Sequence, residues 1–202
     1  MVDFRVYVEG GGSGKSLDDI CRKGFTQFLE KAGVTQNRPR IVACGSRADA
    51  YDRFKTGLKN GQYALLLVDS EAPVTEQSPW RHLLNRPGDG WTKPHGATDD
   101  HCHFMVECIE NWFLADRDTL RIFFGQDFQE SALPAPSRAI ETLAKGPAQA
   151  ALKNATKDCD RNKRYVKGER SFDLLARIDP AKVTAASQWA NRFVTTVKKG
   201  TP

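Results

Sequence analysis

The stretch Phe4-Arg-Val-Tyr-Val-Glu-Gly-Gly-Gly-Ser-Gly-Lys-Ser16 decides how the chain begins to fold. Its alternating run over residues 4–8 predicts a β-strand. A glycine cluster after Glu9 separates this strand from a helical pattern that starts at Leu17, with Ser16 as the expected N-cap. A strand, a glycine-rich turn and a helix in this order form a site at the carboxyl end of a strand in α/β proteins.

Three interpretations of this turn are open. The first is a phosphate-binding P-loop over Gly10–Ser16, whose pattern is G-x-x-x-x-G-K-[ST]. Gly14-Lys15-Ser16 supplies its last three residues, but Glu9 stands where the first glycine belongs, and its carboxylate would repel phosphate. The second makes Glu9 the functional acid, with glycines that let a metal and a substrate come close. The third is a flexible turn with an exposed glutamate.

The next segments alternate between helix and strand. We expect helices over 17–32 and 48–58, and strands over 40–44 and 63–68. The last of these, Tyr63-Ala-Leu-Leu-Leu-Val68, is a continuous apolar run, which is typical of a strand buried on both faces of a parallel sheet. The β-α-β-α-β order predicts an α/β fold with a mainly parallel sheet flanked by helices.

Asp69-Ser70-Glu71 directly follows the buried strand. If the strand continued through these residues, Asp69 and Glu71 would point the same way, toward Glu9 at the tip of the first strand. Three converging carboxylates repel one another unless a divalent cation binds, and oxygen ligands suit Mg²⁺ or Mn²⁺. A P-loop enzyme could use Asp69 instead as its Walker B acid, so this feature alone does not decide the function.

A Pro- and Gly-rich segment over 71–100, with Trp80 and Trp91, reads as a long loop that covers the site. We expect a fourth strand over residues 102–106 and a helix over residues 107–115. Glu110 lies among apolar neighbours in that helix and is therefore expected to be partly buried. His101, Cys102, His103 and Cys108 raise a zinc hypothesis, but their spacing matches no standard structural zinc site.

The C-terminal part is helical and basic. We expect a helix within 135–146 and further helices over 148–157, 171–178 and 181–198. From residue 145 onward there are 13 Lys and Arg against 5 Asp and Glu, whereas the preceding residues hold 17 against 20. We therefore divide the chain into an α/β domain over 1–130 and a basic helical extension over 131–202 packed on the same domain. A basic surface of this kind suits a polyanion such as nucleic acid.

Composition narrows the class of protein further. The chain has 202 residues and a net charge of +5, with five scattered cysteines and no CxxC pair. Such cysteine usage favours a reducing cytosol over a disulfide scaffold. No apolar run approaches membrane-spanning length and no signal-peptide pattern opens the chain, so we expect a cytoplasmic protein with no membrane partner.

Three motifs together resemble a known group of proteins. They are Val8-Glu9-Gly10, Val68-Asp69-Ser70-Glu71 and Glu110-Asn-Trp-Phe-Leu-Ala-Asp116. They are similar to a small TOPRIM-like family of unknown function from bacterial defence islands, related to RloB-like proteins and to the TOPRIM domains of OLD-type nucleases. Tyr165–Phe172 and Ile178-Asp-Pro180 also resemble the C-terminal signature of that family. One departure is Glu71, because TOPRIM sites usually have a second aspartate there.

The resemblance implies metal-dependent cleavage of phosphodiester bonds in DNA or RNA, tRNA included. Mg²⁺ or Mn²⁺ would be held by Glu9, Asp69 and Glu71, with Glu9 alternatively acting as general acid or base. Glu110 and Lys167 complete the candidate catalytic set, and Lys167 would neutralise phosphate charge. The residues expected to follow the nucleic-acid backbone are Lys157, Arg161, Lys163, Arg164, Lys167 and Arg170.

The resemblance also implies a partner. Such proteins look like the nuclease effectors of antiphage systems in which an ABC- or SMC-like ATPase senses infection and controls cleavage. A homo-oligomer is compatible with this arrangement. Two other functions stay open: a P-loop nucleotide-binding protein that depends on Lys15, and a binding or regulatory subunit whose site has degenerated at Glu71.

Overall fold

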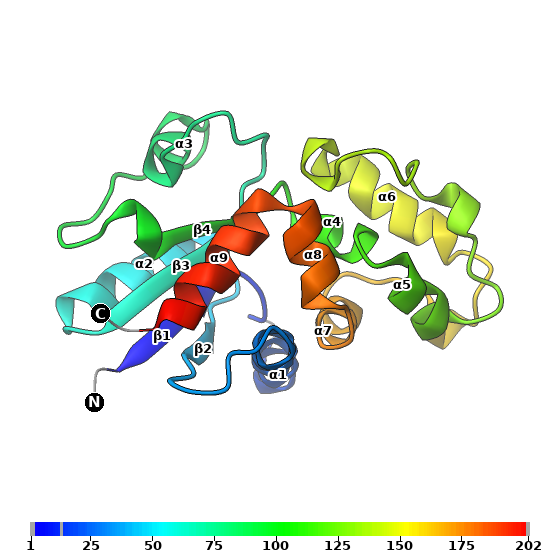
Figure 1. The fold of residues 1–202 in the computed structure, drawn as a ribbon, viewed down its shortest axis with the longest axis horizontal. Helices are drawn as coiled ribbons and strands as arrows, with labels where there is room; N and C mark the ends of the chain where they lie inside the picture. The colour runs from blue at the N-terminus through cyan, green and yellow to red at the C-terminus, as the bar shows by residue number, and fades with distance from the viewer. Residues whose placement is uncertain (1–2, 13, 201–202) are drawn as a thin grey trace.

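Four parallel strands form the single sheet of the computed structural model, which describes residues 3–12 and 14–200. The sheet order is β2-β1-β3-β4 (Figure 1). The strands are β1 (Phe4–Val8), β2 (Arg40–Ala43), β3 (Tyr63–Asp69) and β4 (Cys102–Met105). Helices cover both faces, so the predicted α/β class with a parallel sheet is confirmed.

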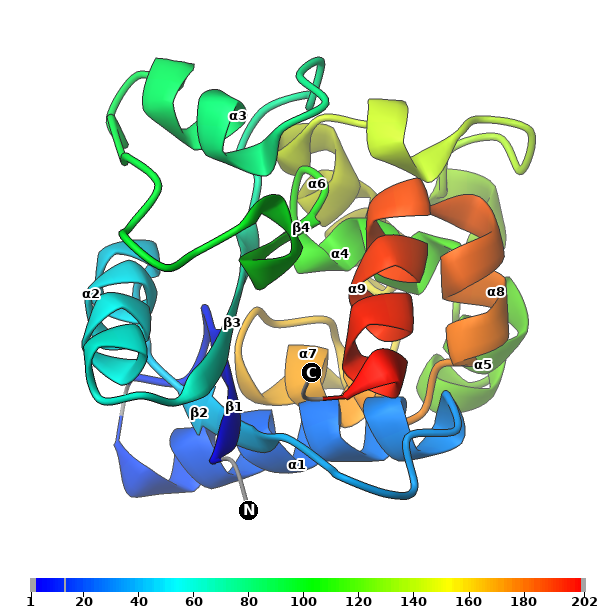
Figure 2. The same cartoon turned by 60° about the vertical axis from the view of Figure 1, so that its left-hand side comes forward.

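The apolar run of β3 is buried on both faces of the sheet because its side chains alternate between two hydrophobic clusters. Leu65 and Leu67 pack with residues of α1 (Lys15–Lys31), whereas Leu66 and Val68 pack with residues of α2 (Arg47–Lys59). Figure 2 shows α1 and α2 on different sides of the strands. A strand that is apolar at every position therefore has an apolar partner for every side chain.

The outer edge of β4 is covered by α9 (Gln188–Lys199), which lies along the sheet in Figure 1. The ring of Phe193 lies 5.4 Å from that of His103, and the ring of Trp189 lies 5.2 Å from that of Phe104. The guanidinium of Arg192 donates to the carbonyl of Cys102 at the start of β4. Covering an edge strand in this way removes a surface on which other chains could pair.

The segment over 71–100 is more ordered than a loop that only covers a site. It contains α3 (Pro79–Asn85), where the sequence predicts a long loop. The indole of Trp80 donates to the carbonyl of Thr98 at 2.9 Å, and Trp91 stacks on Tyr51 of α2 with ring centres 4.5 Å apart. Both tryptophans thus attach the segment to the α2 side of the core.

Most of the C-terminal half belongs to the same hydrophobic cluster as α1 and one face of β1 and β3. It contains α4 (Ile109–Leu114), α5 (Arg117–Phe124), α6 (Lys145–Ala155), α7 (Glu169–Leu175) and α8 (Pro180–Ala186). Among the described residues after 130, Leu133 to Val197 thus contribute to a core shared with the sheet. Neither a helix nor a strand was predicted for the residues of α5.

The helix predicted within 135–146 is wrong. A single 3₁₀ turn over Ile140–Thr142 stands there, and α6 begins only at Lys145. The side-chain amide of Asn111 donates to the carbonyls of Ile140 and Leu143, both at 2.7 Å. An α-helix would need an N–H at residue 147 for the Leu143 carbonyl, and residue 147 is Pro147, which has none. The Asn111 amide therefore replaces the helical hydrogen bonds.

Two helix boundaries also differ from the prediction. The helix expected over 181–198 is interrupted at Ser187, which has extended backbone angles and separates α8 from α9. The Ser187 hydroxyl accepts from the N–H of Ala190 at 3.0 Å and donates to the carboxylate of Glu141, so it begins a new helix. At the other end of the chain, α1 starts at Lys15 after Gly14, and Ser16 lies inside the helix instead of capping it.

Asp116 joins α5 to α8. Its carboxylate accepts hydrogen bonds from the Lys182 ammonium and the Thr119 hydroxyl, and from the backbone N–H of Asp179 at 2.8 Å. Burial raises the pKa of Asp116, but these bonds outweigh it and lower the pKa to about 2, against an ordinary 3.8. Asp116→Asn is expected to reduce the free energy of unfolding by about 2 kcal/mol at neutral pH.

The stability that Asp116 contributes is complete above pH 4 and is lost as the pH falls toward about 2. Urea denaturation at pH 7 and pH 3 measures this, and the difference between wild type and variant should be smaller at pH 3. Asp118→Asn is the control, because Asp118 contacts the same Lys182 but its side chain is 61% exposed. An equal loss of stability in both variants would contradict the role of burial.

Candidate metal centre

The carboxyl ends of β1 and β3 lie side by side where the chain changes direction across the sheet. From β1 the chain continues through α1 to β2 on one side, and from β3 it continues to β4 on the other. Open α/β sheets form their ligand-binding crevice at such a switch point. Glu9 follows β1 directly and Asp69 is the last residue of β3, so both acids lie at this crevice.

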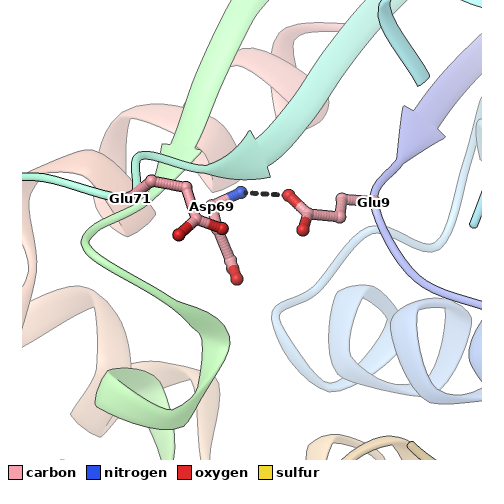
Figure 3. Close-up of side chains that lie close together, drawn as sticks. All are labelled: Glu9, Asp69 and Glu71. Carbon is pink, nitrogen blue, oxygen red and sulfur yellow. Dashed lines mark hydrogen bonds between the residues drawn. The ribbon is translucent and has the colours of Figure 1, made fainter. Parts of the chain in front are cut away.

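Glu9, Asp69 and Glu71 come together as the sequence predicts. One carboxylate oxygen from each residue lies within 4.8 Å of the other two. Figure 3 shows the three side chains converging from the end of β1, the end of β3 and the loop that follows β3. The Glu9 carboxylate also accepts a hydrogen bond from the backbone N–H of Asp69 at 3.0 Å, which fixes it across the gap between the strands.

Glu71 reaches the cluster by a different route from the one predicted. β3 ends at Asp69, so strand alternation does not orient Glu71. Glu71 instead has a φ of +61°, in the left-handed region that residues other than glycine rarely adopt. Its N–H donates to the carbonyl of Glu107 at 2.9 Å, which holds this turn. Backbone strain of this kind is frequent at functional sites.

Burial makes the acid cluster unfavourable unless positive charge compensates it. Asp69 is only 2% exposed, and burial together with the nearby charge of Glu9 raises its pKa well above the ordinary value. Burial also raises the pKa of Glu9, and the guanidinium of Arg47 partly opposes this. A site that collects buried carboxylates in this way is suited to a cation.

Lys145 supplies one compensating charge, and the sequence analysis did not identify it. Its ammonium lies 3.3 Å from the Asp69 carboxylate and forms a hydrogen-bonded ion pair with Glu71. The Lys145 backbone N–H donates to the carboxylate of Glu107 at 3.0 Å, so the start of α6 is fixed beside the cluster. Burial lowers the pKa of Lys145, but Asp69 and Glu71 outweigh this and raise it.

Arg47, at the start of α2, supplies a second charge. Its guanidinium lies 3.9 Å from the Glu9 carboxylate, pairs with Asp89 at 2.5 Å and stacks over the ring of Trp91. The buried Nη1 that faces Glu9 has no hydrogen-bond partner within residues 3–12 and 14–200. This N–H is therefore a donor available to an anion at the crevice.

Lys167 is a third cation near the acids. It lines a pocket of about 260 Å³ together with Glu9 and Asp69. The remaining basic candidates lie on the segment between α6 and α7 or at the start of α7. Lys157, Arg161, Lys163 and Arg164 are exposed, and Arg170 is half-buried.

Glu110 is fully buried in α4, beyond the partial burial that the sequence predicts. One of its carboxylate oxygens accepts from the Tyr165 hydroxyl at 2.8 Å and from the Gln149 amide at 3.3 Å. The Tyr165 hydroxyl also lies 2.9 Å from the hydroxyl of Ser171. Glu110 thus holds Tyr165, two residues before Lys167, and its contacts support a positioning role for the segment that carries Lys167.

Two backbone amides of the glycine turn, those of Gly10 and Gly12, form hydrogen bonds inside the protein. The Gly10 N–H donates to the Gly45 carbonyl at 2.9 Å, and the Gly12 N–H donates to the Asp18 carboxylate at 2.7 Å. A Cβ on Gly12 would lie 2.6 Å from the Cα of Gly45, so only glycine permits this approach. Ser13 lies outside the described residues. These contacts favour the acid-site interpretation over a phosphate-binding P-loop, whose amides face the ligand.

The zinc hypothesis finds no support in the geometry. His103 is buried and its Nε2 bonds to the carbonyl of Asp100 at 2.9 Å, while His101 bonds to Thr98. Over residues 3–12 and 14–200, Glu9, Asp69 and Glu71 form the one group of three or more potential metal ligands.

Within the same residues, no helix has the length and apolar character needed to cross a membrane.

The sequence-based candidates did not include Arg47 and Lys145, and only Arg47 stands in a sequence pattern that pointed to the site. Arg47 follows Gly45-Ser46 at the end of β2, and the carboxyl ends of parallel strands share one edge of the sheet, so this position carried a signal. Lys145 carried none, because it is separated from Asp69 by 76 residues and adjoins no strand.

A family model matches nearly the whole chain. No curated protein and no solved structure matches it. Residues 8–198 match the model of a family described as Domain of unknown function (DUF4276). All the acidic and basic residues of the candidate metal centre fall inside this match. The likeness to TOPRIM nucleases stays a prediction from the sequence motifs. The chain belongs to the DUF4276 family.

Proposed function

We propose that this protein is a divalent-metal-dependent nuclease that hydrolyses phosphodiester bonds. The observation that carries the proposal is the convergence of Glu9, Asp69 and Glu71 at the switch point of the sheet, with oxygens within 4.8 Å of one another. The donor set fits Mg²⁺ or Mn²⁺, because both cations prefer carboxylate oxygens. Such a cation, when bound, would stabilise charge on the phosphate and activate a water molecule.

The chain itself supplies the groups that a phosphodiester substrate needs. Three cations, Arg47, Lys145 and Lys167, surround the acids. The buried Nη1 of Arg47, which has no partner among the described residues, is placed to donate to a phosphate oxygen, and its contacts with Asp89 and Trp91 restrict its movement. Acids for a metal and cations for a phosphate are the two requirements of phosphoryl transfer, in which positioning and electrostatic stabilisation dominate.

Glu9 is placed to contribute in a second way. Its pKa is raised by burial, which moves it toward the range where a carboxyl group exchanges protons near neutral pH. The same side chain is held by the N–H of Asp69, so its orientation is fixed before a substrate arrives. Proton transfer by Glu9 is compatible with metal binding through Asp69 and Glu71.

The resemblance to defence-island proteins extends the proposal. On this basis we propose that the nuclease acts in antiphage defence, as an effector in the cytoplasm that is controlled by an ABC- or SMC-like ATPase. The five cysteines are free and buried, which suits a reducing compartment. DNA and RNA are both retained as substrates, and the exposed basic residues between α6 and α7 are the proposed contacts to the nucleic-acid backbone.

The first test is metal binding by the isolated chain, because it needs neither partner nor substrate. Titration with Mn²⁺, followed by electron paramagnetic resonance, should show binding that excess Mg²⁺ reverses. Cleavage of labelled DNA and RNA should then require Mg²⁺ or Mn²⁺, stop with EDTA and weaken steeply as salt rises. A protein that binds no divalent cation would contradict the proposal. Binding without cleavage would instead direct the assay to the protein together with its ATPase.

A further inference from the structure

The pocket of about 260 Å³ beside Glu9 and Asp69 has a lining of two chemical kinds. Its charged part comes from these two acids and from Lys167. The apolar wall consists of Leu17, Met105, Ile109 and Phe172. With the proposed divalent cation on the two acids, the charged part would attract an anionic group. A ligand that fits both parts then carries an anionic group and a flat apolar body, and this combination describes a nucleotide, with its phosphate and its base.

The walls of this pocket are fixed by contacts inside the protein. The ring of Phe172 lies directly over the glycine turn, because a Cβ on Gly10 would be only 2.6 Å from its edge. The backbone of Phe172 approaches α1 equally closely, since a Cβ on Gly24 would lie 2.7 Å from its carbonyl. The adjacent Ser171 is held by Tyr165. The pocket is therefore largely preformed, as ligand sites usually are.

The depth and size of the pocket limit what can enter it. Asp69 is 2% exposed and Phe172 is 5% exposed, so both lie below the surface of the protein. The volume is slightly below the roughly 300–1,000 Å³ of pockets for drug-sized ligands, which leaves room for about one nucleotide. A base inside a duplex is stacked and paired, and reaching a buried pocket requires that it be extruded or already unpaired.

We propose that this pocket binds one unpaired nucleotide next to the scissile phosphate, and that the substrate is therefore single-stranded nucleic acid. This inference rests on the proposed nuclease function and specifies its substrate class. Leu17, Met105, Ile109 and Phe172 contact the base, and Lys167 faces its phosphate. An apolar wall accepts any base, since every base has an apolar face, so little sequence preference is expected.

The test uses oligonucleotides, DNA and RNA, that contain the fluorescent base 2-aminopurine, with Ca²⁺ as the cation for binding measurements. The single strand should bind at least about tenfold more tightly than the same sequence in a duplex. Leu17→Trp places a large side chain in the pocket and should weaken single-strand binding by about tenfold. Gln27→Trp, on the same helix but outside the pocket, is the matched control and should bind like the wild type.

Mn²⁺ binding by the Leu17→Trp variant shows whether the variant is folded and the acid cluster intact. If that variant binds Mn²⁺ normally and still binds the single strand as tightly as the wild type, the pocket assignment is overturned. Equal binding of duplex and single strand by the wild type overturns it as well, and leaves metal-dependent cleavage standing. Failure of the wild type to bind Mn²⁺ removes the proposed function and this inference together.

Discussion

Asp69→Asn is expected to abolish metal binding and to lower the rate of metal-dependent cleavage by at least about 10³-fold. Asp69 ends the central strand β3, and its oxygens lie within reach of both Glu9 and Glu71. An amide at this position presents only one oxygen and carries no charge, so the attraction for a divalent cation falls sharply. Mn²⁺ titration measures the first effect, and cleavage under single-turnover conditions measures the second.

Asparagine at position 69 keeps one hydrogen bond of the aspartate and loses its ion pair with Lys145. One Asp69 oxygen accepts from the N–H of Ile109 at 2.9 Å, and the amide oxygen of asparagine can keep this bond. The matched control is Asp52→Asn, on the exposed face of α2, which should leave metal binding and cleavage unchanged. If Asp69→Asn kept the Mn²⁺ affinity of the wild type, Asp69 would not be a ligand and the metal centre would have to be placed elsewhere.

Lys145→Met is expected to change metal affinity and stability in opposite directions. The Lys145 ammonium is paired with Asp69 and Glu71, which are two of the three proposed ligands, so it competes with a bound cation. Methionine keeps the length of the side chain without its charge. Mn²⁺ should then bind about tenfold more tightly, as expected when an opposing charge leaves a partly screened site.

Without metal, the same variant should be less stable. Removing one partner of a buried ion pair leaves the other charge uncompensated, at a cost of about 3–5 kcal/mol. Lys145 is partly exposed, so we expect about 2–3 kcal/mol here, and saturating Mg²⁺ should recover most of it. Thermal unfolding with and without Mg²⁺ provides the measurement.

Lys153→Met, in the last turn of the same helix, is the control and should behave like the wild type in both experiments. Cleavage by Lys145→Met should fall in spite of tighter metal binding if the ammonium also faces the phosphate. Unchanged or weaker Mn²⁺ binding by Lys145→Met would show that Lys145 does not compete for the carboxylates, and would contradict this account of the site.

The sequence determined the parts of the structure that depend on local patterns. The continuous apolar run of β3 required burial on both faces, and the β-α-β-α-β order required helical crossovers between strands, so the parallel sheet followed. Because the carboxyl ends of parallel strands meet at one edge, the proximity of Glu9 to Asp69 followed as well. Their convergence with Glu71 is confirmed.

The tertiary structure decided what local patterns cannot specify. The helix predicted within 135–146 had suitable apolar spacing, but Asn111 takes the carbonyls of Ile140 and Leu143, and the chain bends so that Lys145 begins α6 instead. The break at Ser187 has the same kind of cause, a hydrogen bond to Glu141 from a distant part of the chain. Local propensity is a weak signal that tertiary contacts override.

The balance of charge at the site shows this division most clearly. The three acids could be found from the sequence, because Glu9 and Asp69 stand at the ends of neighbouring parallel strands and Glu71 follows Asp69 by two residues. The cations Arg47 and Lys145 that make the cluster tolerable come from the starts of two helices, and Lys145 is 76 residues from Asp69 in the chain. Sequence patterns thus indicated the three acids and Lys167, whereas packing in three dimensions, where burial makes every charge require a partner, brought Arg47 and Lys145 to the acids.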